Sequence, residues 1–206
     1  MNYWYLGKLQ QPVIDFFLEE IYKRRDPTRW YQWVQFDDFL NNEFMKIFDN
    51  RELEVSYDPN SKSWIQKAFF SQPGHGFRIH KDGVRCKTAL NIALQCNDSD
   101  WVRWYDDKHI NSLSKSVTSM TSGKVSGGTV GESRNVEIQE YENIEFIEER
   151  KTSPGDVYLV NTDVYHSFKC NGPKDRVIIQ TKFKGYPNIQ TVKEKLEKTS
   201  FNCFIR

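Results

Sequence analysis

His80 and Asp82 stand two residues apart within Phe77–Gly83, a segment with the pattern of a short β-strand. Because side chains on a strand alternate between its two faces, we expect Arg78, His80 and Asp82 on the same face. An imidazole nitrogen and a carboxylate oxygen placed in this way can bind one metal ion. Gly83 lets the chain turn directly afterwards. A two-residue match is common by chance, so the metal hypothesis needs support from elsewhere in the chain.

That support comes from the C-terminal third of the sequence. The turn Pro154-Gly155 precedes an apolar strand at 156–161, and His166 follows after a short connection. Arg176 lies ten residues beyond His166 and opens another apolar strand. Two histidines and one carboxylate on one side of an octahedral ion suit Fe(II) and leave three adjacent positions free. A guanidinium matches a carboxylate with two parallel hydrogen bonds and stays charged.

In these motifs the chain resembles the 2-oxoglutarate/Fe(II) dioxygenases. More narrowly, His80-Lys81-Asp82-Gly83, followed by Ala89–Leu94 and Trp104-Tyr105, resembles the small prolyl-hydroxylase-like and asparaginyl-hydroxylase-like members common in phage and marine microbial genomes. The resemblance covers about residues 64–184 and does not extend to the N-terminal helices.

The resemblance implies a catalytic iron centre. Fe(II) would be bound by His80, Asp82 and His166, with 2-oxoglutarate as co-substrate, O2 as oxidant and ascorbate as a candidate reductant. The far carboxylate of 2-oxoglutarate would be bound by Arg176. The expected reaction is hydroxylation of an unidentified substrate, a small molecule or a peptide side chain, with release of succinate and CO2.

The strand predicted at 87–95 offers two further candidates. One of its faces contains Lys87, Asn91 and two alanines, which leaves room for a small polar ligand, and the other face is apolar and can pack against helices. By resemblance, Asn91 is expected near the co-substrate. Lys87 is a rival of Arg176 for the far carboxylate, because some relatives bind it from this strand.

Two positions bear on how closely the resemblance holds. Many relatives have Ser or Thr two residues after the arginine that binds the co-substrate, and here that position is Ile178. A second hydrogen bond to the far carboxylate must therefore come from another residue. Asp82 is present, which argues against the halogenase branch, in which a halide takes the place of the carboxylate.

The whole chain, residues 1–206, is expected to form one domain. Residues 1–50 form its mostly helical part, with helices near 12–24 and 37–48 and an irregular or extended stretch at 30–34. Residues 51–184 alternate short strands with Pro, Gly and Asn turns, which predicts a mainly β jelly roll, a cupin-like double-stranded β-helix with the N-terminal helices packed on one sheet. Residues 185–206 are expected to form a C-terminal helix and tail.

The segment 111–133 does not fit a compact core. Ser, Gly, Thr and Lys dominate it, which predicts one long loop with no regular structure. Such loops are often lids or binding loops, and an insertion without a role is the equal alternative.

The bulk composition excludes several classes of protein. The formal net charge is +1, so the chain has no electrostatic footprint for nucleic acid, and no stretch reaches the length of a membrane-spanning helix. The four cysteines show no paired spacing, which is typical of reduced thiols in an intracellular protein. We therefore expect a cytoplasmic protein, of microbial or phage type by resemblance.

Two other functions are compatible with the same residues. The first is another metal-dependent cupin-type enzyme that needs no keto acid, for which Arg176 would have no role. The second is a non-catalytic jelly-roll binding module that kept only the scaffold, since a fold does not by itself determine a function.

Overall fold

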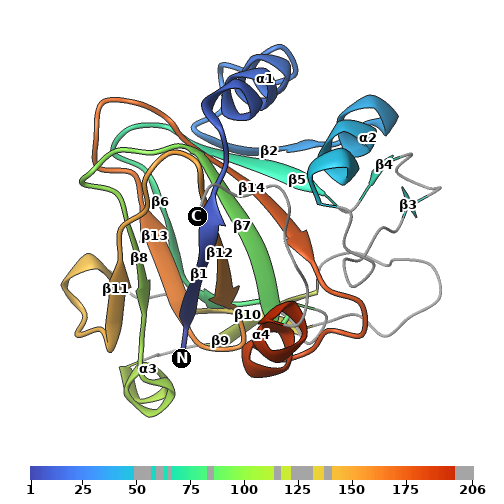
Figure 1. The fold of residues 1–206 in the computed structure, drawn as a ribbon. Helices are drawn as coiled ribbons and strands as arrows, with labels where there is room; N and C mark the ends of the chain where they lie inside the picture. The colour runs from blue at the N-terminus through green and yellow to red at the C-terminus, as the bar shows by residue number, and fades with distance from the viewer. Residues whose placement is uncertain are drawn as a thin grey trace.

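The computed structural model describes residues 1–48, 57–58, 63–64, 66–82, 86–113, 117–121, 132–136 and 141–197. They form two facing six-stranded β-sheets with helices on the outside, and a separate pair of short strands, β3 (Tyr57–Asp58) and β4 (Ser63–Trp64) (Figure 1). The first sheet has the order β1 (Tyr3–Lys8), β12 (Asp156–Asn161), β7 (Thr88–Gln95), β14 (Arg176–Lys182), β5 (Lys67–Ser71) and β2 (Tyr31–Gln35). The second has the order β11 (Glu148–Arg150), β8 (Trp101–Trp104), β13 (His166–Lys169), β6 (Gly76–Lys81), β10 (Glu132–Val136) and β9 (Val117–Thr121).

The chain crosses from one sheet to the other at almost every connection of the core. From β5 to β8 successive strands alternate between the sheets, and β12, β13 and β14 alternate again. All neighbouring strands pair antiparallel, so that β14 lies between β7 and β5, and β13 lies between β8 and β6. This strand order is that of a double-stranded β-helix, which confirms the predicted fold class. It also brings strands that are far apart in the sequence side by side.

The helices cover the outer face of the first sheet, as predicted. The helices on this face are α1 (Gln11–Tyr22), α2 (Asp38–Ile47) and α4 (Ile189–Glu197). A further helix, α3 (Asp107–Leu113), follows β8, and a 3-10 turn spans Tyr141–Asn143. In α1, Ile14, Phe17 and Ile21 recur at helical spacing and are buried against the apolar face of β7. The side chain of Asp37 accepts a hydrogen bond from the backbone N–H of Leu40 and caps the start of α2.

The segment 111–133 was predicted wrongly as one structureless loop. Residues 111–113 end α3, and β9 and β10 form an antiparallel pair that extends the second sheet next to β6. Residues 114–116 and 122–131 lie outside the described residues. Composition misled the prediction because Ser and Gly are typical of turns and loops, while pairing in a sheet depends more on context than on the propensity of single residues.

Other boundaries also differ from the prediction. Of the stretch at 30–34, predicted as irregular or extended, residues 31–34 are extended and belong to the edge strand β2. Strand β1 was not predicted. Between β10 and β12 the described residues form the 3-10 turn and the short strand β11. The predicted tail after residue 197 lies outside the described residues. In the described part of the chain, no helix is long and apolar enough to cross a lipid bilayer.

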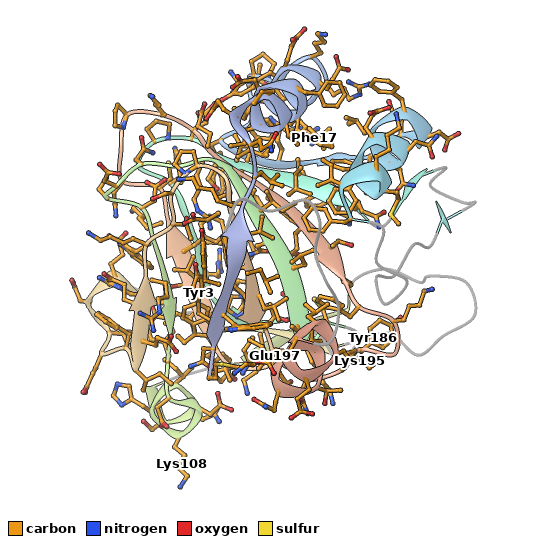
Figure 2. The ribbon with its side chains drawn as sticks, in the orientation of Figure 1. Tyr3, Phe17, Lys108, Tyr186, Lys195 and Glu197 are labelled. Atoms are coloured by element: carbon orange, nitrogen blue, oxygen red, sulfur yellow. The ribbon has the colours of Figure 1, made fainter. Side chains whose placement is uncertain are left out.

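Phe17 provides a test of how α1 is attached to the sheet. It is 1% exposed, stacks on Phe36 and lies on the sheet-facing side of α1 (Figure 2). Phe17→Ala should lower the free energy of unfolding by about 3–5 kcal/mol, because it removes buried area and leaves a cavity. Phe39→Ala, at a ring that is 48% exposed, should cost less than about 1 kcal/mol. Urea unfolding of both variants makes the comparison, and similar costs would show that α1 is not packed as described.

Candidate metal centre

His80 and His166 face each other across the pairing of β6 with β13. Their Cα atoms are direct partners in this pair, and their ring centroids are 4.2 Å apart. The Nδ1 atom of each ring lies 2.9 Å from the backbone carbonyl two residues earlier, that of Arg78 for His80 and that of Val164 for His166. An Nδ1–H that donates to a carbonyl leaves Nε2 as the free lone pair. Both imidazoles are therefore held in the form that binds a cation through Nε2.

Asp82, the first residue after β6, completes the group of candidate metal ligands. Its backbone N–H donates to the carbonyl of Thr162 (3.0 Å), which places the carboxylate next to the histidines. Asp82 Oδ1 lies 3.6 Å from Nε2 of His80, and one ligand atom from each of Asp82, His80 and His166 lies within 4.8 Å of the other two. One cation can contact all three. Among the described residues, no other set of three histidine, cysteine or acidic side chains comes this close.

The face on which these residues lie is set by an irregularity that the sequence did not reveal. Between β6 and β13 the register shifts, so that Phe168 pairs with Phe77 while His166 pairs with His80. Two residues of β6, Arg78 and Ile79, therefore oppose one residue of β13, Ser167, as in a β-bulge. As a result Phe77, and not Arg78, lines the same cavity as His80 and Asp82. The predicted place of Arg78 was wrong, and its side chain is exposed.

A cavity of about 260 Å³ lies between the two sheets beside this group. Both sheets contribute to its wall, and the wall combines apolar side chains with a few polar ones. Arg176 and Asn91 line it together with the three candidate ligands, so the structure brings these five predicted residues to one space. Lys87 is not among the lining residues, although its backbone carbonyl accepts a hydrogen bond from Thr162. Ile178, the position at which relatives have Ser or Thr, does line the cavity.

Arg176 brings a buried positive charge to the cavity. Arg176 is the first residue of β14 and is 6% exposed. Its guanidinium carbon lies 4.7 Å from the ring centre of Phe168. Within the described part of the chain, no carboxylate forms an ion pair with it. Since buried charges are normally paired, a guanidinium in this situation favours an anion entering the cavity.

Asn91 and Tyr158 lie near Arg176, and of the two only Asn91 lines the cavity. Asn91 and Tyr158 are directly opposite each other on β7 and β12, and the side-chain oxygens of both are buried without a well-formed hydrogen bond. Burial raises the pKa of Tyr158, so that its hydroxyl stays protonated and able to donate. Sequence reasoning missed Tyr158. Alternation along 156–161 places it on the inward face, which is the signal that could have found it.

Burial also controls the protonation of His80. It lowers the pKa of His80 to about 4, and the neighbouring His166 adds to this, while the Asp82 carboxylate opposes it. A neutral imidazole is the form that binds metals. The ring is therefore ready to bind a cation over the physiological pH range.

The three side chains should bind one divalent ion. Titration of the metal-free protein with Mn(II), followed by calorimetry, is expected to give a single site. Asp82→Ala or His166→Ala should weaken metal binding by at least about a hundredfold. Loss of a residue that only hydrogen-bonds to a metal ligand already lowers metal affinity about 10–100-fold, and these two residues are the ligands themselves. Asp163→Ala, which removes an exposed carboxylate three residues from His166, should bind as the parent does. Unchanged affinity in the two ligand variants would exclude the site.

The buried neutral state of His80 also predicts how stability depends on pH. In the unfolded chain this histidine binds a proton below its ordinary pKa of 6.5, whereas the folded metal-free protein does so only near pH 4. The free energy of unfolding should therefore fall as the pH is lowered from about 6.5 to about 4, by up to ~1.4 kcal/mol per pH unit from this site. His80→Gln cannot take up the proton. Urea unfolding at several pH values should therefore show that its free energy of unfolding falls less steeply with decreasing pH than that of the parent. An identical slope in the variant would contradict the prediction.

Comparison with known proteins adds distant likenesses. No family model matches the chain. A protein described as an FAD-linked oxidoreductase, hmp9 of Hypomyces subiculosus, is 27% identical over 139 residues, which is 56% of this chain but only 22% of that protein. The chain thus spans about a fifth of the length of this relative.

Two solved structures match most of the chain at low identity. HygX from Streptomyces hygroscopicus, with nickel and 2-oxoglutarate bound, matches 89% of this chain and 84% of its own with 10% identity and a TM-score of 0.49. A Pseudomonas putida prolyl-4-hydroxylase matches 88% of this chain and 91% of its own with 13% identity and a TM-score of 0.44. The set of two histidines and one carboxylate is a donor set that non-haem Fe(II) oxygenases use.

Proposed function

We propose that this protein is a 2-oxoglutarate- and Fe(II)-dependent oxygenase, a hydroxylase of an organic substrate. The observation that carries the proposal is the content of one cavity. It holds a set of two histidines and one carboxylate, and also a buried arginine that no described carboxylate neutralises. A metal and a dianionic keto acid together would satisfy both.

The residues fit Fe(II) by their chemistry. His80 and His166 would each contribute Nε2, and Asp82 one carboxylate oxygen, and this donor set is the one found in non-haem Fe(II) oxygenases. Fe(II) held by these residues would supply, together with 2-oxoglutarate and O2, the oxidation that places one oxygen atom in a C–H bond of the substrate and the other in succinate, with loss of CO2 from 2-oxoglutarate.

Arg176 fits the far carboxylate of the keto acid. Its fork of N–H donors can bind both carboxylate oxygens, and its guanidinium carbon is packed over the ring of Phe168. The amide of Asn91 lines the cavity, and its oxygen is buried without a well-formed hydrogen bond, so it is a candidate for the second hydrogen bond that Ile178 cannot provide. An amide can present either its oxygen or its NH2 group toward the cavity by rotation.

The apolar residues of the cavity wall limit the access of water to the candidate ligands. Phe77 packs edge-on against the His80 ring, with centroids 4.6 Å apart, and it stacks on Phe168. These rings and Val102 make the surface around the ligands apolar. Excluding water strengthens the attraction between Arg176 and a carboxylate, and protects reactive species from side reactions.

The proposal is tested by the amount of succinate formed from 2-oxoglutarate with Fe(II) and ascorbate under air. The parent should form succinate slowly without a substrate and faster with one, whereas Asp82→Ala and His166→Ala should form almost none. If these two variants turn over as well as the parent, the protein is not this kind of oxygenase.

The role of Arg176 has a separate test. Arg176→Met should raise the KM for 2-oxoglutarate by at least about tenfold, since losing one partner of a buried charge pair costs about 2–5 kcal/mol. Lys87→Met should leave this KM unchanged, because Lys87 does not line the cavity. The opposite result would assign the far carboxylate to Lys87. An active metal enzyme that is indifferent to Arg176→Met would be a cupin-type enzyme with another co-substrate.

A further inference from the structure

The inner face of the first sheet continues past the cavity. Lys67 on β5 is the direct partner of Gln180 on β14, and Trp33 on β2 is the direct partner of Phe69 on β5. Gln180 and Phe69 both line the cavity. Because directly opposite residues in a sheet point to the same face, Lys67 and Trp33 stand on the cavity side, one strand further out.

Lys182 belongs to the same face. It lies two residues beyond Gln180 on β14, and alternation along a strand places its side chain on the same side. We refer to Trp33, Lys67 and Lys182 as the basic rim of the cavity.

The positive charges of Lys67 and Lys182 are close enough to repel each other. Burial lowers the pKa of Lys67, and the charge of Lys182 lowers it further. In the described ranges neither ammonium group forms an ion pair. By contrast, lysines elsewhere on the surface do pair with carboxylates, namely Lys23, Lys46, Lys81, Lys169 and Lys193. Two neighbouring positive charges, one of them partly desolvated, would be stabilised by an anion.

Trp33 adds a flat apolar surface to this positive charge. Its indole is 56% exposed, and Nζ of Lys67 lies 5.4 Å from the ring centre. A large aromatic side chain left this exposed beside a binding cavity is available for stacking on a ligand. The basic rim thus offers one place for an anionic group and one for a flat apolar group, side by side.

The size of the cavity indicates why a substrate would need the rim. At about 260 Å³ the cavity is smaller than most ligand sites, which span ~300–1,000 Å³. Under the proposed function, a metal ion and a keto acid already occupy part of that space. A substrate can then insert only its reacting end, and the rest of it must lie on the surface next to the cavity.

We propose that the primary substrate is a small organic anion, whose carboxylate or phosphate is bound by Lys67 and Lys182 and whose flat apolar part lies on Trp33. The assignment rests on the proposed function for the reaction, but the binding itself needs only the rim. It places the substrate's charged end outside the metal cavity and its reacting carbon inside.

Binding can be measured at Trp33 without turnover. The protein is labelled with 5-fluorotryptophan, and its 19F spectrum is recorded with Mn(II) and 2-oxoglutarate present, the Trp33 signal being assigned with Trp33→Phe. Phenyl phosphate and benzoate are the anionic probes, and benzamide is the uncharged probe of similar shape. We expect at least one of the anions to shift the Trp33 signal saturably and benzamide to leave it in place. The anion that binds more tightly identifies the charged group.

Variants of the rim provide the decisive comparison. Replacing both lysines, as Lys67→Met with Lys182→Met, keeps their apolar stems and should raise the Kd for the anionic probe at least tenfold. Lys108→Met is the matched control and should have no effect, because Lys108 is exposed and extends from α3 away from the rest of the protein (Figure 2). Circular dichroism checks that each variant is folded.

Three results would overturn the inference. Benzamide could shift the Trp33 signal as much as the anions do, or the double lysine variant could bind the anions as tightly as the parent. The third is a loss of 2-oxoglutarate affinity in the double variant as large as that in Arg176→Met, which would assign the lysines to the co-substrate. A failure of the oxygenase proposal looks different. Succinate would not form, while the anion would still bind at the rim and depend on both lysines.

Discussion

The antiparallel pairing of β6 with β13 is the interaction on which the candidate site depends. It places the Cα atoms of His80 and His166 opposite each other, although the two residues are separated by most of the jelly roll in sequence. The bulge in the same pair turns Phe77 into the cavity, where its ring supports that of His80. Each imidazole is then fixed by a hydrogen bond to a backbone carbonyl two residues earlier in the chain. The strand pair therefore determines which nitrogen faces the cavity, and Asp82 needs only to follow the end of β6 to complete the set.

The second constraint is electrostatic. The chain buries a guanidinium in the wall of the cavity and leaves two lysines on the rim, and no described carboxylate pairs with any of the three. Burying Arg176 would be costly unless an anion binds there during function. The helices contribute to this indirectly. By burying the apolar face of β7, they leave its small and polar face, with Asn91, for the cavity. The residues of the apolar core that the helices cover lie on the outer face of the first sheet, and the candidate binding residues lie on its inner face.

Sequence reasoning found the parts of this account that rest on local pattern. His80, Asp82, His166, Arg176 and Asn91 were all identified from residue type, spacing and resemblance, and the structure brings them to one cavity.

The consequences of pairing between distant strands could not be predicted in the same way. The bulge between the His80–His166 pair and the Phe77–Phe168 pair cannot be read from alternation along one strand, so the exposed Arg78 was placed on the wrong face. Tyr158 and the rim residue Lys67 gain their meaning only from their strand partners, Asn91 and Gln180. The strands β9 and β10 were hidden by a composition typical of loops.

The most direct test of the central claim is to locate a bound metal. Crystals grown with Mn(II) and 2-oxoglutarate, with data collected to measure the anomalous signal of manganese, would place the ion without assumptions about activity. The account predicts one strong peak in contact with Nε2 of His80, Nε2 of His166 and a carboxylate oxygen of Asp82, with the keto acid extending from it to Arg176. A peak elsewhere, or no peak where these three side chains converge, would contradict it.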